Sequence, residues 1–422
     1  MKKSILSKLF NKKNNKEIEE YSKRIGRGNI VYQNDHTILV HDSCRICYNK
    51  PMKKSFDERC KYISDKIKLG HDSILEHSNV IMRLELEKDL YSELCEVLTL
   101  SKYINSKIKE TDNSIEVLLG GSIRGYRHII RFIKNPNNRV YNIIKNSLYD
   151  LPSCYFVDMI EDNIMNEKLF SNFDIKVENK LDSDGNIINS RRYEGIRIER
   201  EKYDIVGIDD VMEVYSKVNN NIKEEYFSID DIMDIVTISI LFKGISRTAS
   251  HQLVRHRAGI TQLSQRYVNM KDSKFLSPDE FKPEKYNPND KYNITINGVT
   301  KQYTLQEIGK LELGIYEQLL EQNLLKEDAR SFLPNNIETS LYMTFTFRGF
   351  IKFLELRTGK GAQEEIKQLA KALKEDFEST QYTSIGNDIY SYLRENYNRI
   401  PMDLDKLGQE RVDEILEEEI IK

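Results

Sequence analysis

Two absences limit what this chain of 422 residues can be. It has only five cysteines, too few for a disulfide scaffold in a chain of this size, which favours a reducing, cytoplasmic location. No apolar run approaches the roughly 18 residues that a membrane-spanning helix needs, so we expect no membrane partner. The basic first residues lack the apolar core and cleavage site of a secretory signal and predict a tail or a surface helix.

Metal-binding patterns are also scarce. Cys44 and Cys47 form a CxxC pair, but no second pair with the spacing of a zinc site accompanies it. We therefore expect no metal site, and we interpret the pair as two small, half-buried side chains.

A third absence is local. Between Ser246 and Val268 there is no aspartate or glutamate. The same stretch holds the cationic side chains Arg247, Arg255, His256, Arg257 and Arg266. A solvated helix face would intersperse carboxylates among such charges, so we expect the balancing anions to be the phosphates of a ligand. The net charge of −3 for the whole chain argues against nucleic acid as that ligand.

The local pattern indicates how this stretch folds. The apolar run from Val236 to Gly244 predicts a buried strand. Ser246 is a good N-cap for a helix that we expect to reach about Arg257. A short loop after Ala258–Gly259 would then return the serine, glutamine and arginine of SQRYV. Backbone amides, a hydroxyl and a guanidinium together suit a phosphate.

These residues resemble a known family. SR…HQLV, then RHR, a short spacer and SQRYV are similar to the signature of flavin-dependent thymidylate synthase (ThyX), with a spacer that is one residue shorter than usual. Three further segments agree with this resemblance in the family's order: SCRICY, GHDSILEH ahead of a strand-like run, and EDARSFLP ahead of TFRGFIKFLELR and AQEEI. The agreement of all four segments is more specific than any one motif.

The resemblance implies an α+β fold in which an antiparallel-type sheet is flanked by helices, with a large inserted region between the first two core strands. We expect these parts in chain order: a basic tail or surface helix at 1–30, the first part of the catalytic domain at 31–88, an insertion at 89–233, the second part of the catalytic domain at 234–380, and a helical extension at 381–422.

The insertion contains two patterns of note. Its polar part at 181–203 predicts a hairpin or a mobile loop, since DSDG is a turn signal. Its segment SIRGYRHIIRF echoes TFRGFIKFLELR from the later part of the chain, a hint of an internal repeat that one short echo does not establish.

The resemblance also implies residue roles. The dUMP-binding set would be Gln252, Leu253, Val254, Arg255, Leu263, Ser264, Gln265, Arg266, Arg330 and Arg357. The FAD-binding set would be Asn79, Arg255, His256, Arg257, Gln262, Thr346, Phe347, Arg348 and Lys352. Arg357 would be the catalytic residue, because a guanidinium that stays protonated cannot act as a base but can stabilise negative charge on the uracil ring.

The implied reaction is the reductive methylation of dUMP to dTMP. Methylenetetrahydrofolate would supply the carbon, and FAD reduced by NADPH would supply the hydride. The resemblance further implies a homotetramer whose active sites are shared between subunits. The alternative is a non-catalytic relative that binds nucleotide or nucleic acid, and nucleic-acid binding would weaken steeply with salt.

Overall fold

The computed structural model describes residues 26–33, 36–50, 55–170, 180–181, 187–188, 198–199, 201–209, 211–219 and 227–378. The chain divides into two compact units. Unit 1 comprises Met1–His41, Lys53–Glu194 and Asp209–Thr237, whereas unit 2 comprises Asp42–Met52, Gly195–Ile208 and Ile238–Lys422. The expected tail at 1–30 lies largely outside the described residues, and the extension at 381–422 lies wholly outside them.

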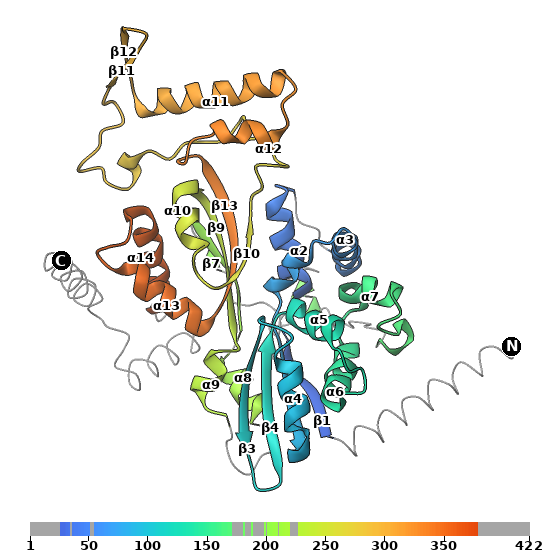
Figure 1. Ribbon diagram of the computed structural model, residues 1–422. Helices are drawn as coiled ribbons and strands as arrows, with labels where there is room; N and C mark the ends of the chain where they lie inside the picture. Colours follow the sequence, from blue (N-terminus) through green and yellow to red (C-terminus); the bar gives the residue numbers. More distant parts are fainter. Residues whose placement is uncertain are drawn as a thin grey trace, which may run out of the picture. The chain divides into compact units, whose positions relative to one another are not determined.

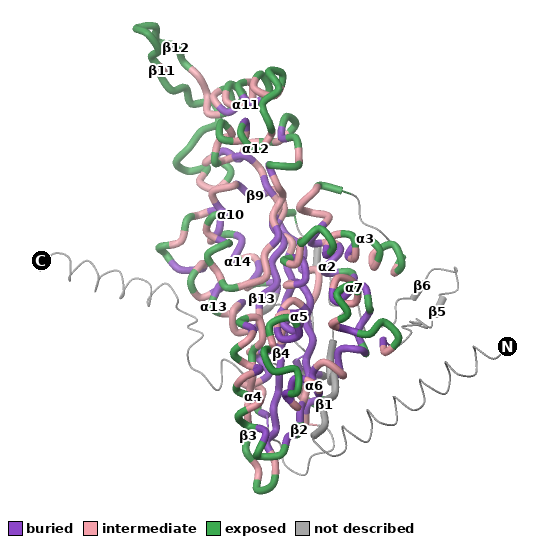
Figure 2. Tube along the Cα trace, turned by 45° about the vertical axis from the view of Figure 1, so that its right-hand side comes forward, coloured by how far each residue is buried: buried purple, intermediate pink, exposed green. Residues whose placement is uncertain are grey.

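Unit 1 contains a four-stranded antiparallel sheet (Figure 1). Its strands are β1 (Gly26–Gln33), β2 (Val80–Glu87), β3 (Ile104–Glu110) and β4 (Ser114–Gly121), in the order β1-β2-β4-β3. The central strand β4 is buried along almost its whole length, as Figure 2 shows, and its sequence is accordingly a nearly continuous apolar run.

The helices of unit 1 follow the order of the chain. They are α3 (Phe56–Lys68), α4 (Tyr91–Leu98), α5 (Ile123–Phe132), α6 (Arg139–Ser147), α7 (Val157–Glu161), α8 (Val211–Val218) and α9 (Ile229–Met233). Helix α2 (His36–Cys47) begins in unit 1 and ends in unit 2. The short strands β5 (Lys180–Leu181) and β6 (Ile187–Ile188) pair with each other, which agrees with a hairpin in the part of 181–203 that is described.

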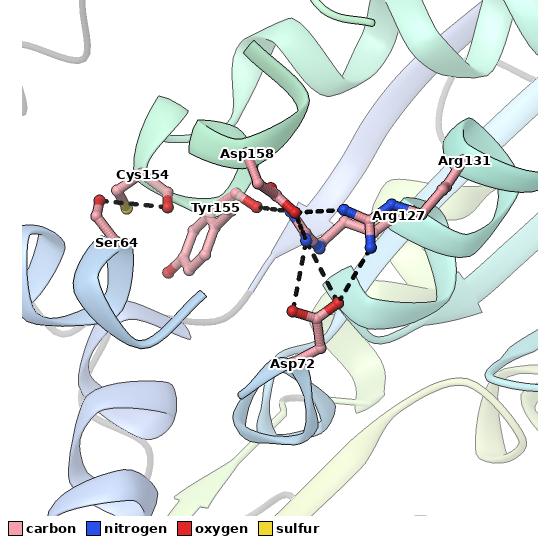
Figure 3. Close-up of polar contacts among 7 residues, drawn as sticks. All are labelled: Ser64, Asp72, Arg127, Arg131, Cys154, Tyr155 and Asp158. Carbon is pink, nitrogen blue, oxygen red and sulfur yellow. Dashed lines mark hydrogen bonds and ion pairs between the residues drawn. The ribbon is translucent and has the colours of Figure 1, made fainter. Parts of the chain in front are cut away.

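A buried ion network joins three segments of unit 1. The Arg127 side chain on α5 is only 1% exposed. It donates to both carboxylate oxygens of Asp158 at 2.9 and 2.8 Å, to Asp72, and to the carbonyl oxygen of Tyr155 (Figure 3). Arg131, one helical turn later, also pairs with Asp158. The network fixes α5 against α7 and the segment around Asp72.

Unit 2 contains a five-stranded sheet. Its strands are β7 (Ile198–Glu199), β8 (Tyr203–Ile208), β9 (Thr237–Ser246), β10 (Gly259–Gln262) and β13 (Glu338–Thr346), in the order β10-β13-β9-β8-β7. A separate hairpin is formed by β11 (Tyr292–Ile296) and β12 (Val299–Tyr303). Asn297 and Gly298 both have positive φ at its turn, the conformation that an Asn-Gly hairpin turn requires.

Aromatic packing fixes the helix that carries Arg357. The helices of unit 2 are α10 (Arg247–Leu253), α11 (Leu305–Glu321), α12 (Lys326–Ala329), α13 (Phe347–Thr358) and α14 (Glu364–Glu378). Phe353 of α13 packs on Phe345 of β13 and Phe242 of β9, with ring centroids 5.5 and 6.4 Å apart. These contacts seat α13 on the two central strands of the sheet.

The expected fold class of helices with antiparallel sheet is confirmed. The strands that we expected to be the first two of one core, β2 and β9, lie in two different sheets. No helix among the described residues is long and apolar enough to cross a membrane.

Replacing Arg127 should destabilise unit 1. In Arg127→Met, Asp72 and Asp158 lose a buried partner, so we expect the free energy of unfolding to fall by about 3 kcal/mol in urea titrations followed by circular dichroism. The control is Lys68→Met, which removes the exposed Lys68–Glu161 pair and should cost no measurable stability. Equal small losses in both variants would contradict a structural role for the network.

Candidate active site

The cationic stretch of unit 2 begins at Ser246, where two sets of hydrogen bonds fix the start of α10. Ser246 caps α10 by accepting a hydrogen bond from the Ala249 amide at 3.0 Å. The buried carboxylate of Glu365, on α14, accepts hydrogen bonds from both the amide and the hydroxyl of Ser246. Burial raises the pKa of Glu365, although these bonds act in the opposite direction. Glu365 therefore joins α14 to the start of α10, a role that its sequence context did not reveal.

Helix α10 is shorter than the sequence predicts. It ends at Leu253 and not near Arg257, so the prediction that Arg255, His256 and Arg257 occupy its last turn is wrong. The reason is tertiary: Gly259–Gln262 pairs with β13, with Gly259 opposite Thr344. The chain must leave the helix after Val254 in order to reach this ladder. Gln262 consequently lies on a strand and not in a loop.

Arg357 is the centre of the polar contacts in unit 2 that join the predicted site residues. Its Nε donates to Nε2 of His256 at 3.0 Å. Its two terminal nitrogens donate to the side-chain and main-chain oxygens of Gln252, each at 3.4 Å. The Gln252 amide in turn donates to Gln363. Gln252 and His256 thus form one cluster with Arg357, which lies 105 and 101 positions further along the sequence.

The positive charge of this cluster is not neutralised within the described part of the chain. No carboxylate there pairs with Arg247, Arg255, Arg257 or Arg357. Burial lowers the pKa of Arg357, and the like charge of Arg255 lowers it further. Burial likewise lowers the pKa of Arg247, with Arg330 acting in the same direction. An anion bound here would relieve this repulsion, as the acid-free sequence predicts.

Arg266 and Arg330, both in the predicted dUMP-binding set, contact Glu327, a residue that we did not predict. Arg266 donates to the carboxylate of Glu327 at 2.9 Å, and Arg330 donates to the main-chain oxygen of Glu327 at 3.2 Å. Glu327 stands three residues before Arg330 in the segment that carries the resemblance, so its position in the sequence could have suggested this contact. Its carboxylate brings an anion to Arg266, from which a phosphate could also accept hydrogen bonds.

The segment SCRICY contributes to the same unit. The Ser264 amide donates to the carbonyl oxygen of Cys47 at 3.0 Å, and the rings of Tyr48 and Tyr267 lie 5.2 Å apart. Burial raises the pKa of Tyr48 to about 12, so its phenol stays neutral at physiological pH. Two motifs that are far apart in the sequence therefore meet in unit 2.

The remaining predicted residues occupy varied environments. Gln262 donates to the hydroxyl of Ser250 at 2.8 Å. Thr346 caps α13 by accepting from the Gly349 amide at 3.1 Å, which places Arg348 and Lys352 in the first two turns of that helix. Three others, Leu253, Phe347 and Gln265, are buried. Leu263 packs against a hydrophobic core cluster. Val254 is exposed, as its place after the end of α10 explains.

Asn79 belongs to unit 1, unlike the other predicted residues. It is fully buried directly before β2. Its amide nitrogen donates to Asp209 at 2.7 Å and to the carbonyl oxygen of Ile235 at 2.8 Å. Within unit 1, Asn79 therefore joins the start of β2 to Asp209, two residues before α8, and to Ile235, two residues after α9.

Comparisons with known proteins agree with the resemblance. Residues 203–380 match the model of the Thy1 family, described as thymidylate synthase complementing protein. The chain is 31% identical over 144 residues to a flavin-dependent thymidylate synthase of Mycobacterium tuberculosis strain H37Ra, which covers 33% of this chain and 56% of that protein. It is 33% identical over 165 residues to one of Sulfolobus acidocaldarius, covering 38% and 55%.

A viral relative and a solved structure were also found. The chain is 34% identical over 134 residues to a probable flavin-dependent thymidylate synthase of Paramecium bursaria Chlorella virus 1, covering 31% of this chain and 62% of that one. A crystal structure of ThyX from Helicobacter pylori with FAD and dUMP is 24% identical over 39% of this chain and 75% of that one, with a TM-score of 0.26.

Residues 203–380 thus match the Thy1 family model, and the resemblance of this chain to the flavin-dependent thymidylate synthases is confirmed. The chain spans about half the length of the first curated relatives that it matches, 56% for the mycobacterial protein.

The titration of His256 should reveal its contact with Arg357. Burial lowers the pKa of His256 to about 4, and the charge of Arg357 acts in the same direction. Because its pKa is lower in the folded chain than the ordinary value of about 6.5, the contribution of His256 to stability is complete above pH 6.5 and is lost as the pH falls towards 4. After allowance for solvent screening, we expect this loss to be about 2 kcal/mol.

The measurement is NMR titration of the imidazole, combined with urea unfolding across the same pH range. His256→Gln keeps an acceptor for Arg357 but cannot titrate, so its stability should not show this component. A His256 signal that titrates near pH 6.5 would contradict the buried contact.

Proposed function

We propose that the chain is a flavin-dependent thymidylate synthase that methylates dUMP to dTMP. The observation that carries this proposal is the Arg357 cluster. Segments around Gln252, His256 and Arg357 converge in unit 2, and their positive charge has no carboxylate to balance it among the described residues. The Thy1 family model matches the region that contains this cluster, and the chain is similar to relatives named as flavin-dependent thymidylate synthases, which supports the assignment.

Arg357 would act on the uracil ring by electrostatics. A guanidinium remains protonated even when burial lowers its pKa, so it cannot remove a proton. It can stabilise negative charge that develops on the ring as C5 becomes nucleophilic, an effect that is strong in a site that excludes water. The neutral imidazole of His256 accepts a hydrogen bond from Arg357 and so fixes the plane of the guanidinium.

Arg266 and Arg330 would bind the phosphate of dUMP. Glu327 contacts both residues, and the Arg266–Glu327 pair is about half exposed. A dianionic phosphate offers more acceptor oxygens than a carboxylate, and it would displace Glu327 from Arg266. Ser264 and Gln265 precede Arg266 directly and would contribute a hydroxyl and an amide. Gln252, with Leu253, Val254 and Leu263, would line the path to the ring.

FAD would bind through Arg255, His256, Arg257, Arg348 and Lys352. The three arginines and the lysine combine positive charge with several donors, which suits a pyrophosphate, and the neutral His256 would contribute through its contact with Arg357. When bound and reduced by NADPH, FAD supplies the hydride, and methylenetetrahydrofolate supplies the carbon. Gln262, Thr346, Phe347 and Asn79 complete the proposed set. We further propose a homotetramer with shared active sites, working in the cytoplasm without a membrane or nucleic-acid partner.

The test is a visible absorption spectrum of the purified protein before and after addition of FAD and dUMP. We expect a flavin band that persists through desalting and shifts when dUMP is added. Arg357→Ala should keep the flavin band but lower the rate of dTMP formation by at least about 100-fold, since it removes the group that stabilises charge on the ring.

The matched control is Arg139→Ala, which removes an arginine that pairs with Glu93 and Asp89 on the surface of unit 1 and should leave the rate unchanged. A colourless protein that binds neither FAD nor dUMP would contradict the proposed function. Affinity for DNA or RNA that falls steeply with salt would point to the non-catalytic alternative.

A further inference from the structure

The two sheets share one strand order. Unit 1 has β1-β2-β4-β3, and unit 2 has β8-β9-β13-β10, with β7 added at the β8 edge. The strands and helices that the two sheets share also follow each other in the same order along the chain. A first strand is followed by two helices and a second strand, then by a helix and a third strand, and finally by a fourth strand that leads into a helix. Unit 2 differs in that the β11–β12 hairpin, α11 and α12 stand between its third and fourth strands.

The backbone register agrees between the two sheets. Gly28 pairs with Leu84 in the first, and Tyr203 pairs with Phe242 in the second. Three residues after Gly28 and after Tyr203, the register shifts, because one extra residue, Val31 or Val206, interrupts the ladder. Bulges are specific features of a fold, so an identical position in both sheets is strong evidence of a repeat.

The fourth strand leads into a helix in the same way in both units. Ser122 caps α5 by accepting from the Gly125 amide, and Thr346 caps α13 by accepting from the Gly349 amide. The capped sequences are Ser-Ile-Arg-Gly-Tyr and Thr-Phe-Arg-Gly-Phe. The echo that the sequence hinted at therefore coincides with equivalent positions of two equivalent sheets, and His128 of α5 corresponds to Lys352 of α13.

The segment between the second and third strands differs between the repeats. In unit 2 it carries the acid-free stretch with Arg255, His256 and Arg257. In unit 1 the corresponding residues, 88–103, contain Asp89, Glu93 and Glu96 but no arginine or histidine. The first repeat therefore lacks the cations that we assign to the ligands.

The cations that the first repeat does carry on its capped helix are already neutralised. Arg124 pairs with Glu76, and its guanidinium lies over the ring of Tyr103. Arg127 pairs with Asp72 and Asp158 (Figure 3). A phosphate at this helix would have to compete for Arg124 and Arg127 with the carboxylates that already pair with them. In the second repeat, by contrast, Arg255 and Arg257 have no such carboxylates among the described residues.

We infer that the chain is a tandem repeat of one fold in which only the second repeat binds the phosphate-bearing ligands, so that each chain binds one dUMP and one FAD. The identity of these ligands rests on the proposed function. On this reading, residues 89–233 complete the first repeat and begin the second. The first repeat keeps the sheet and the capped helix, with its own carboxylates where the second repeat would bind phosphate.

Neither repeat corresponds to one unit, so the test needs the full chain. Asp42–Met52, which follows the first strand of the first repeat, belongs to unit 2, and Asp209–Thr237, which follows the first strand of the second, belongs to unit 1. Equilibrium titrations of the full chain with FAD, followed by flavin fluorescence, and with dUMP, followed by calorimetry, give the number of ligands per chain. We expect one of each.

A matched pair of variants checks the count. Lys352→Ala should weaken FAD binding by roughly tenfold, whereas His128→Ala, at the corresponding position of the first repeat, should leave both the affinity and the count unchanged. Two equivalents of FAD per chain, with each variant removing one of them, would overturn the inference while leaving the proposed function intact. No binding of FAD or dUMP at all would contradict the proposed function itself and the inference with it.

Discussion

The repulsion among guanidinium groups in unit 2 is the constraint on which the candidate site depends. Arg255 and Arg357 are close enough for each charge to disfavour the other, and burial adds to this cost. A folded chain retains such an arrangement when an anion compensates for it. Arg127 in unit 1 shows the other solution, because the charge of its buried guanidinium is paired with two carboxylates of the same unit. Arg127 therefore belongs to a structural network, whereas Arg357 belongs to a candidate binding site.

The framework of unit 2 maintains this repulsive cluster through contacts on either side of it. Glu365 ties α14 to the start of α10 through Ser246, which fixes the direction in which Gln252 projects. The packing of Phe353 on β9 and β13 seats α13 and so positions Arg357. The pairing of β10 with β13 ends the helix early and turns His256 towards Arg357. Each contact has at least one partner outside the cationic stretch itself.

The sequence predicted the components of the site better than their conformation. The strand before Ser246, the cap at Ser246 and the convergence of the RHR segment with Arg357 follow from local patterns and from the family resemblance. The end of α10 was missed because strand pairing with β13, about eighty residues away, outweighs helix propensity. Glu327 and Glu365 were missed because a carboxylate in a charged helix gives no local sign of a distant partner. The repeat was visible only as one short echo, since its evidence lies in strand order and in a shared bulge.

The most direct test of the central claim compares dUMP with deoxyuridine by calorimetry on the protein loaded with FAD. The two ligands share a sugar and a uracil ring, so they differ only in the phosphate that the cationic residues are proposed to bind. We predict that deoxyuridine binds at least about 100-fold more weakly than dUMP, because charge-assisted hydrogen bonds from several arginines are lost. Equal affinity for the two ligands would show that the guanidinium groups of unit 2 do not serve as a phosphate site.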